Sequence, residues 1–202
     1  MAKGFSTRTQ TIRTVEGVVE RAPTRGGFPG RRGLKKRPTL ACALTLWICT
    51  SAALAEDGCG KFAWPVSQER EALIAQGQPT LASGDSIEPG PGQAFKLLLR
   101  LPDEVVFVMP PERKPRIENW RAGFVRLPAP PQAGIYQVTL SDEAWVDVVQ
   151  NGGYARSIGS SGRSDCPGLR KTIRFEIASS PIALQISGAS VEAISVVVGQ
   201  SR

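Results

Sequence analysis

An aromatic residue and a carboxylate two positions apart are the first candidate for a binding site. Trp145 and Asp147 alternate with Val146 and Val148, which form the apolar side of the segment. Residues two apart on a strand share a face, so we expect the Trp and Asp to point out of the sheet, beside Tyr136 on a neighbouring strand. An exposed indole next to a carboxylate can stack on a sugar ring and hold its hydroxyl groups. The alternative, which the pattern favours, is that Trp145 packs under a loop or against a second sheet and Asp147 is a solvated charge.

A basic, Pro-rich segment around Trp120 is the second candidate. Its Arg and Lys side chains are Arg113, Lys114, Arg116, Arg121 and Arg126. Such a group can clamp an anion such as a phosphate, an acidic polysaccharide or a lipid head group. The interleaved Glu112 and Glu118 favour the alternative of a solvated loop with local ion pairs.

The absence of histidine limits the catalytic chemistry. With no His in the chain, Ser-His-Asp and Cys-His catalysis and His-ligated zinc, iron or copper are excluded. Residues 160–165 contain serines for which Lys171 is a candidate base, since Ser-Lys pairs exist, but the strand–turn–helix context of a nucleophile is missing. Asp142, Glu143 and Asp147 are carboxylates for glycoside hydrolysis, but spacing distinguishes no pair among them. We predict no metal site and no cofactor.

Alternation with a period of two predicts the strands that position these residues. The segments are 95–101, 104–109, 124–127, 135–140, 144–149, 172–177, 182–187 and 194–198. A further strand over 154–158 follows the hairpin signal Asn151-Gly152-Gly153, and residues 159–168 read as a turn region. One-sided alternation without helical crossovers is typical of antiparallel sheets. We therefore predict a mainly β fold, an antiparallel β-sandwich of about eight strands with a jelly-roll or immunoglobulin-like layout.

One short helix is predicted before the strands, over residues 68–76. Ser67 is a candidate N-cap, and Gly77 can end the helix. The expected apolar stripe consists of Val66, Leu73 and Ile74.

Positive charge concentrates at the start of the chain. Residues 1–55 hold ten of the 25 Lys and Arg residues but two of the 18 acidic ones, so the remainder is close to neutral. A basic run at 31–37, an apolar run at 38–52 and Ala53-Leu54-Ala55 are typical of a signal peptide. The apolar run is shorter than the roughly 20 residues that span a bilayer, although an uncleaved N-terminal anchor remains the alternative.

The predicted organisation has three parts. Residues 1–30 are a disordered basic extension or an overextended start, residues 31–55 are a signal peptide cleaved after Ala55, and residues 56–202 are a single mature β-sandwich domain. No membrane span is expected after cleavage. A nearly neutral exported domain is not expected to bind nucleic acid.

Two cysteines remain after the predicted cleavage. Cys59 and Cys166 should form a disulfide in an oxidising compartment. Closing a loop of about 107 residues is worth at most about 4–5 kcal/mol in the chain-entropy description. The alternative is two free buried thiols.

The stretches 133–140, 166–171 and 184–188 resemble a group of small exported proteins of unknown function from Gram-negative bacteria. Their layout is similar to the bacterial pre-peptidase C-terminal β-sandwich, in which a Gly-x-Tyr strand precedes strands that end in a Leu-x-Leu-type run. The resemblance covers about 100–140 residues and implies no catalytic residue. The acidic calcium-binding positions seen in some such domains are not evident in this sequence. Relatives of this group are sometimes labelled homogentisate 1,2-dioxygenase. That iron chemistry needs two His and a carboxylate, which a chain without His does not supply.

Together these patterns predict a periplasmic or secreted, non-catalytic β-sandwich that binds an envelope ligand or partner: a glycan, a small molecule or a protein. The candidate binding residues are Trp145, Asp147, Tyr136, Arg113, Arg116 and Trp120. One alternative is a glycan hydrolase that uses carboxylates without His, and another is a structural or stress-related envelope protein without a ligand site. Two carboxylates about 5–10 Å apart on a concave surface would favour the hydrolase, and an exposed aromatic platform would favour binding.

Overall fold

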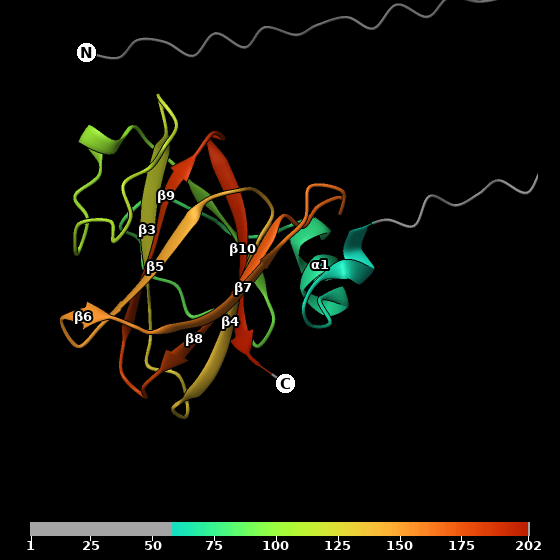
Figure 1. The fold of residues 1–202 in the computed structure, drawn as a ribbon. Helices are drawn as coiled ribbons and strands as arrows, with labels where there is room; N and C mark the ends of the chain where they lie inside the picture. The colour runs from blue at the N-terminus through green and yellow to red at the C-terminus, as the bar shows by residue number, and fades with distance from the viewer. Residues whose placement is uncertain (1–57, 202) are drawn as a thin grey trace, which may run out of the picture. The chain divides into compact units, whose positions relative to one another are not determined.

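The computed structural model describes residues 58–201, which form two packed β-sheets and one α-helix (Figure 1). The predicted signal peptide, its cleavage site after Ala55 and the extension over residues 1–30 lie outside the described residues. Within residues 58–201, no helix has both the length and the apolar character to cross a membrane.

The two sheets have the strand order of a jelly roll. The six-stranded sheet runs β1-β2-β10-β4-β8-β7 and the four-stranded sheet runs β3-β9-β5-β6. Successive strands from β2 to β5, and again from β8 to β10, alternate between the sheets, which is the jelly-roll arrangement of antiparallel strands. The β1–β2 pair is parallel. The strands are β1 Thr80–Leu81, β2 Ala94–Leu98, β3 Arg121–Leu127, β4 Gly134–Leu140, β5 Trp145–Gln150, β6 Gly153–Tyr154, β7 Ser157–Gly162, β8 Lys171–Ile177, β9 Ile182–Ala189 and β10 Ala193–Gln200.

The predicted mainly β sandwich is confirmed, with two local corrections. Seven of the predicted segments overlap β2, β3, β4, β5, β8, β9 and β10. The predicted strand over 104–109 is wrong: Val105 and Phe107 pack inward and Val106 points outward, but the segment crosses the outside of a sheet instead of joining its edge. Conversely, the edge strand β7 begins in the predicted strand over 154–158 but continues through residues 159–162, Ser and Gly positions where a turn region was expected. Its composition is unfavourable for a strand, and pairing with β8 overrides that preference.

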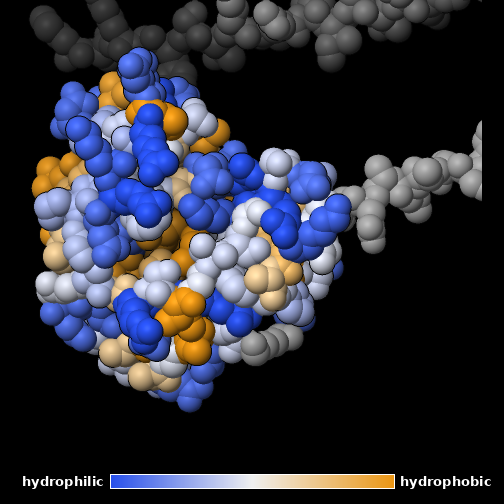
Figure 2. Space-filling view, in the orientation of Figure 1, coloured by the Kyte–Doolittle hydropathy of each residue, from blue (hydrophilic) through white to orange (hydrophobic). Residues whose placement is uncertain are grey.

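The core lies between the inner faces of the two sheets. Alternate residues of each strand supply it, so Phe95, Leu97 and Val138 from one sheet meet Leu184 and Ile186 from the other. The face shown in Figure 2 is largely hydrophilic, and apolar residues gather in a hollow near its middle, where Figure 1 shows the space between the sheets. The inner apolar faces therefore come near the surface on this side.

Two segments cover the outer faces of the sandwich. The N-terminal cover (residues 58–78) contains α1, Ser67–Ile74, and packs Phe62, Val66 and Leu73 against Val197 of β10. The β2–β3 loop (residues 99–120) contains the short 3-10 turn Pro102–Glu104 and lies on the other side of the molecule (Figure 1). Each sheet is therefore buried on its inner face and partly covered on its outer face. The alternation of apolar and polar residues along the strands does not reveal this outer cover.

The helix begins one residue earlier and ends two residues earlier than predicted. Its N-cap is Val66, not Ser67, and no side chain caps the start. The end is closed by Gln78, whose Nε2 donates to the carbonyl oxygens of Ala72, Leu73 and Ala75 at 2.7–3.2 Å. Ile74 is 55% exposed, so its predicted place in the apolar stripe is wrong.

The predicted disulfide between Cys59 and Cys166 is present. It joins the 3-10 turn Gly58–Lys61 to the connection between β7 and β8. The Gly58 amide also donates to the carbonyl oxygen of Asp165 at 2.9 Å. The bond therefore fastens the N-terminal cover to the six-stranded sheet.

Candidate functional site

The Trp145–Asp147 pair lies on the outer face of β5, beneath the β2–β3 loop. Trp145 Nε1 donates to Asp147 Oδ1 at 2.6 Å, and the Glu112 amide donates to Asp147 Oδ2 at 3.2 Å. Asp147 is only 2% exposed, so its expected position as a solvated or ligand-facing charge is wrong. Trp145 packs under a loop, as the alternative interpretation proposed.

The ring of Trp145 is covered by cationic groups. Arg113 Cζ lies 4.5 Å from the ring centroid and Lys171 Nζ lies 5.7 Å from it. Lys171 Nζ also donates to Glu143 Oε1 at 3.0 Å and to the Ala144 carbonyl at 2.9 Å. Cation–π contacts of this kind stabilise the arrangement and occupy surface that a sugar ring would need for stacking.

Tyr136 does not lie beside this pair. It belongs to β4 in the six-stranded sheet, whereas Trp145 and Asp147 belong to β5 in the other sheet. Its ring is buried in the core, and its hydroxyl donates to the Gln132 carbonyl at 2.9 Å. The expected exposed aromatic platform is therefore not formed by these residues.

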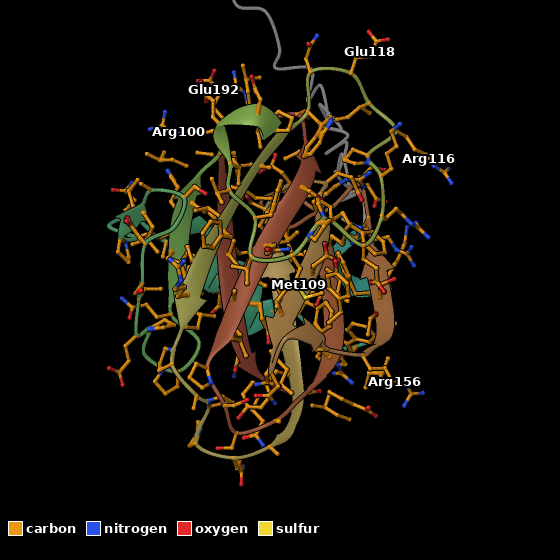
Figure 3. All side chains as sticks on the ribbon, turned by 90° about the vertical axis from the view of Figure 1, so that its left-hand side faces the viewer. Arg100, Met109, Arg116, Glu118, Arg156 and Glu192 are labelled. Carbon is orange, nitrogen blue, oxygen red and sulfur yellow. A yellow bond between two sulfur atoms is a disulfide. The ribbon has the colours of Figure 1, made fainter. Side chains whose placement is uncertain are left out.

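The basic residues around Trp120 have separate partners. Arg116 points away from the sheets at the outer edge of the molecule (Figure 3), and Trp120 is half-buried in a small apolar cluster with Phe124. Arg121 pairs with Glu192 at 2.8 Å. Arg126 donates to the Gly84 carbonyl at 2.6 Å and lies over the Phe124 ring. These contacts support local structural roles more than a shared anion clamp.

A buried glutamine that sequence reasoning missed fixes the β2–β3 loop to the sheet. Gln185 Oε1 accepts from the amides of Val108 and Met109 at 2.8 and 3.1 Å, and its Nε2 donates to the Met109 carbonyl at 3.1 Å. The side chain is 1% exposed, and Met109 lies in front of the four-stranded sheet in Figure 3. The Tyr154 hydroxyl donates to the Pro110 carbonyl nearby. The one available signal was a large polar residue in a strand that is mostly apolar.

The serine and carboxylate candidates do not assemble a catalytic group. Ser161 Oγ accepts from the Ala63 amide at 3.1 Å, while Lys171 Nζ is held by Glu143 and Ala144. Asp142 accepts from Ser141 Oγ at 2.6 Å. Within residues 58–201, no group of three Cys, Asp or Glu residues is placed to hold a metal ion.

Burial raises the pKa of Asp147, although the hydrogen bonds from Trp145 and the Glu112 amide oppose the shift. A raised pKa means that the folded protein keeps its proton at a pH where the unfolded chain has lost it. Between the ordinary Asp value of about 3.9 and the raised folded value, the stability contributed by Asp147 therefore falls as the pH rises. Above the folded pKa the penalty stays constant.

The variant Asp147→Asn should remove this pH dependence. We expect the unfolding free energy of the wild type, minus that of the variant, to decrease as the pH is raised from 4, and to level off once Asp147 is ionised in the folded state. Urea denaturation of both proteins at matched pH values measures the difference. A difference that is constant, or that grows with pH, would contradict the assignment.

A groove opens at the end of the sandwich where β3, β8 and β10 finish. One cavity, lined by both sheets, has a volume of about 340 Å³, and an adjoining cavity of about 360 Å³ shares Glu88, Leu127 and Pro128 with it. We call the two together the end groove. Both sheets contribute apolar side chains: Tyr136, Ile177 and Val198 from one, Leu127 and Ile182 from the other. The loop walls contain the prolines Pro89, Pro91, Pro128, Pro130 and Pro131.

The proline walls make the end groove rigid and poor in donors. Proline has a fixed φ and no backbone N–H. The 128–133 loop is further held by Ser179 Oγ, which donates to the Pro130 carbonyl at 2.8 Å. Of the six candidate binding residues, Tyr136 lies here, and its hydroxyl is already bonded to Gln132. Sequence reasoning treated these prolines as turn residues alone, because nothing local shows that two loops meet at one end of a core.

Comparison with protein-family models, with curated proteins and with solved structures found no match to this chain. The resemblance to the pre-peptidase C-terminal sandwich therefore stays a prediction. The jelly-roll class rests on the strand order itself.

Proposed function

We propose that this protein is an exported, non-catalytic jelly-roll protein of the bacterial envelope that binds a small apolar ligand in the end groove. The observation that carries the proposal is the groove itself: a cavity of about 340 Å³ with an apolar lining from both sheets. Ligand pockets in proteins typically have volumes of about 300–1,000 Å³, mostly apolar walls and a few polar groups. The leader sequence supports export.

The other interpretations have less support in the geometry. A glycan platform at Trp145 is disfavoured because Arg113 and Lys171 lie over the ring. A carboxylate hydrolase is disfavoured because both oxygens of Asp147 are bonded beneath a loop, and Glu143 is paired with Arg170 and Lys171. A purely structural protein would bind no ligand in the groove. The following experiment distinguishes this alternative from the proposed ligand binding.

Filling the groove should weaken binding of an apolar probe. Val198 is half-buried, packs against the main core and lines the groove, so Val198→Phe places extra volume there. We expect the affinity for Nile red, a neutral apolar dye, to fall about tenfold, which corresponds to about 1.4 kcal/mol. Fluorescence titration of the protein, expressed from the full 202-residue sequence and recovered from the periplasmic fraction of a Gram-negative host, measures the affinity.

The matched control is Val191→Phe. Val191 is also half-buried against the main core, but it lies between β9 and β10 at the opposite end of the sandwich. This variant carries the same change in volume and a similar overpacking cost, and should keep the wild-type affinity. Equal affinities in all three proteins, or no binding to the wild type, would contradict the proposed function. Recovery of the protein from the cytosol alone would contradict export.

A further inference from the structure

We infer that the end groove selects ligands that carry a positively charged group on an apolar body, and that the carboxylate of Glu88 recognises the charge. This inference rests on the proposed function and specifies the chemical class of its ligand. Glu88 lines both cavities and therefore stands where they meet. It is the carboxylate that the groove lining presents.

The hydrogen-bonding groups of the groove favour a donor over an acceptor. The five wall prolines have carbonyl oxygens but no N–H groups. The Tyr136 hydroxyl is donated to the Gln132 carbonyl, and Gln200 Oε1 accepts from Gln132 Nε2 at 3.1 Å. The side-chain donor in the cavity lined by both sheets is Gln200 Nε2. An ammonium group brings N–H donors to the proline carbonyls, whereas a carboxylate or phosphate would depend on that amide.

The one cation of the lining is held elsewhere. Arg126 lines the adjoining cavity, but its Nη1 donates to the Gly84 carbonyl at 2.6 Å and its guanidinium lies 4.9 Å from the Phe124 ring centroid. No hydrogen bond or ion pair among the described residues joins Arg126 to Glu88. The Glu88 charge therefore remains open to a ligand.

Apolar walls strengthen the effect of that charge. A carboxylate at the edge of a low-dielectric cleft attracts a cation more strongly than one on an open surface. A neutral ligand that covers Glu88 removes water from the carboxylate and offers no charge in its place, which costs binding free energy. A cation compensates the carboxylate for the lost hydration. An apolar body fills the cavity, and the charged end lies at its junction with the adjoining cavity.

Three probes with the same six-carbon chain test the inference: hexylamine, hexan-1-ol and hexanoate. Each is measured at pH 7 by displacement of Nile red from the same periplasmic protein. We expect hexylamine to bind about fivefold more tightly than hexan-1-ol, as for a partly exposed ion pair, and hexanoate to bind most weakly. Added salt should weaken hexylamine binding and leave hexan-1-ol binding unchanged.

Glu88→Gln is the test variant and Glu118→Gln is its control. Glu118 is an exposed carboxylate of the β2–β3 loop that points away from the sheets (Figure 3) and lines neither cavity. The first change should make hexylamine and hexan-1-ol equal, and the second should preserve the fivefold preference. Equal binding of the two probes to the wild type, or tightest binding of hexanoate, would overturn the charge selection and leave groove binding intact. Failure of all three probes and of Nile red would overturn both.

Discussion

Replacing both Cys59 and Cys166 with alanine is expected to lower the free energy of unfolding by up to about 4–5 kcal/mol. The disulfide joins residues 107 positions apart, and a cross-link over so long a loop removes much conformational freedom from the unfolded chain. Its loss also leaves the N-terminal cover attached only by noncovalent contacts, namely the apolar packing of Phe62, Val66 and Leu73 and hydrogen bonds such as Gly58 to Asp165.

Denaturation with and without a reducing agent measures this effect. The oxidised wild type should unfold at a clearly higher urea concentration than the double variant, and reduction of the wild type should bring the two close together. The double variant itself should not respond to the reducing agent, which controls for effects of that agent on solvent or protein. Unchanged stability of the wild type on reduction would contradict the prediction.

The second large effect is expected for Gln185→Ala, at about 3 kcal/mol. The change removes three hydrogen bonds to the backbone of the β2–β3 loop, each worth about 1 kcal/mol net. It also leaves the amides of Val108 and Met109 without their partner. The loop should then separate from the four-stranded sheet more often than the sheet itself unfolds.

Gln137→Ala is the matched control for this prediction. Gln137 is also buried, at 4% exposure, but it lies on the other sheet and bonds the side chains of Thr139 and Arg174. Its replacement should cost about 1–2 kcal/mol without affecting the loop. Hydrogen exchange should show faster exchange at the amides of Val108, Met109 and Glu112 in Gln185→Ala alone. Equal protection of these amides in both variants would mean that Gln185 does not anchor the loop.

The strands of the core were predictable because alternation is a local property. Phe95 with Leu97, and Leu184 with Ile186, identify the buried side of each strand from the sequence, and the structure places them in one core. The disulfide was predictable for a different reason, since the chain has four cysteines but the two that remain after the predicted cleavage permit a single intramolecular pairing.

The candidate site was less predictable because it depends on partners far away in the chain. Trp145 and Asp147 do share a face of β5, as the pattern indicated. That face is covered by a loop whose alternating Val105 and Phe107 resemble a strand, so no local pattern indicated where the loop packs. Tyr136 shares the expected alternation but belongs to the opposite sheet.

Sequence alone determined the β architecture, the apolar side of most strands, the cysteine pair and the exclusion of His-based chemistry. Tertiary structure alone decided the jelly-roll strand order, the burial of Asp147 and the end groove formed by two proline-rich loops. The physical reason is that alternation reports which side chains share a face over a few residues. Long-range contacts decide which segment packs on that face. The sequence around each of the contacting segments does not show which other segment it will meet.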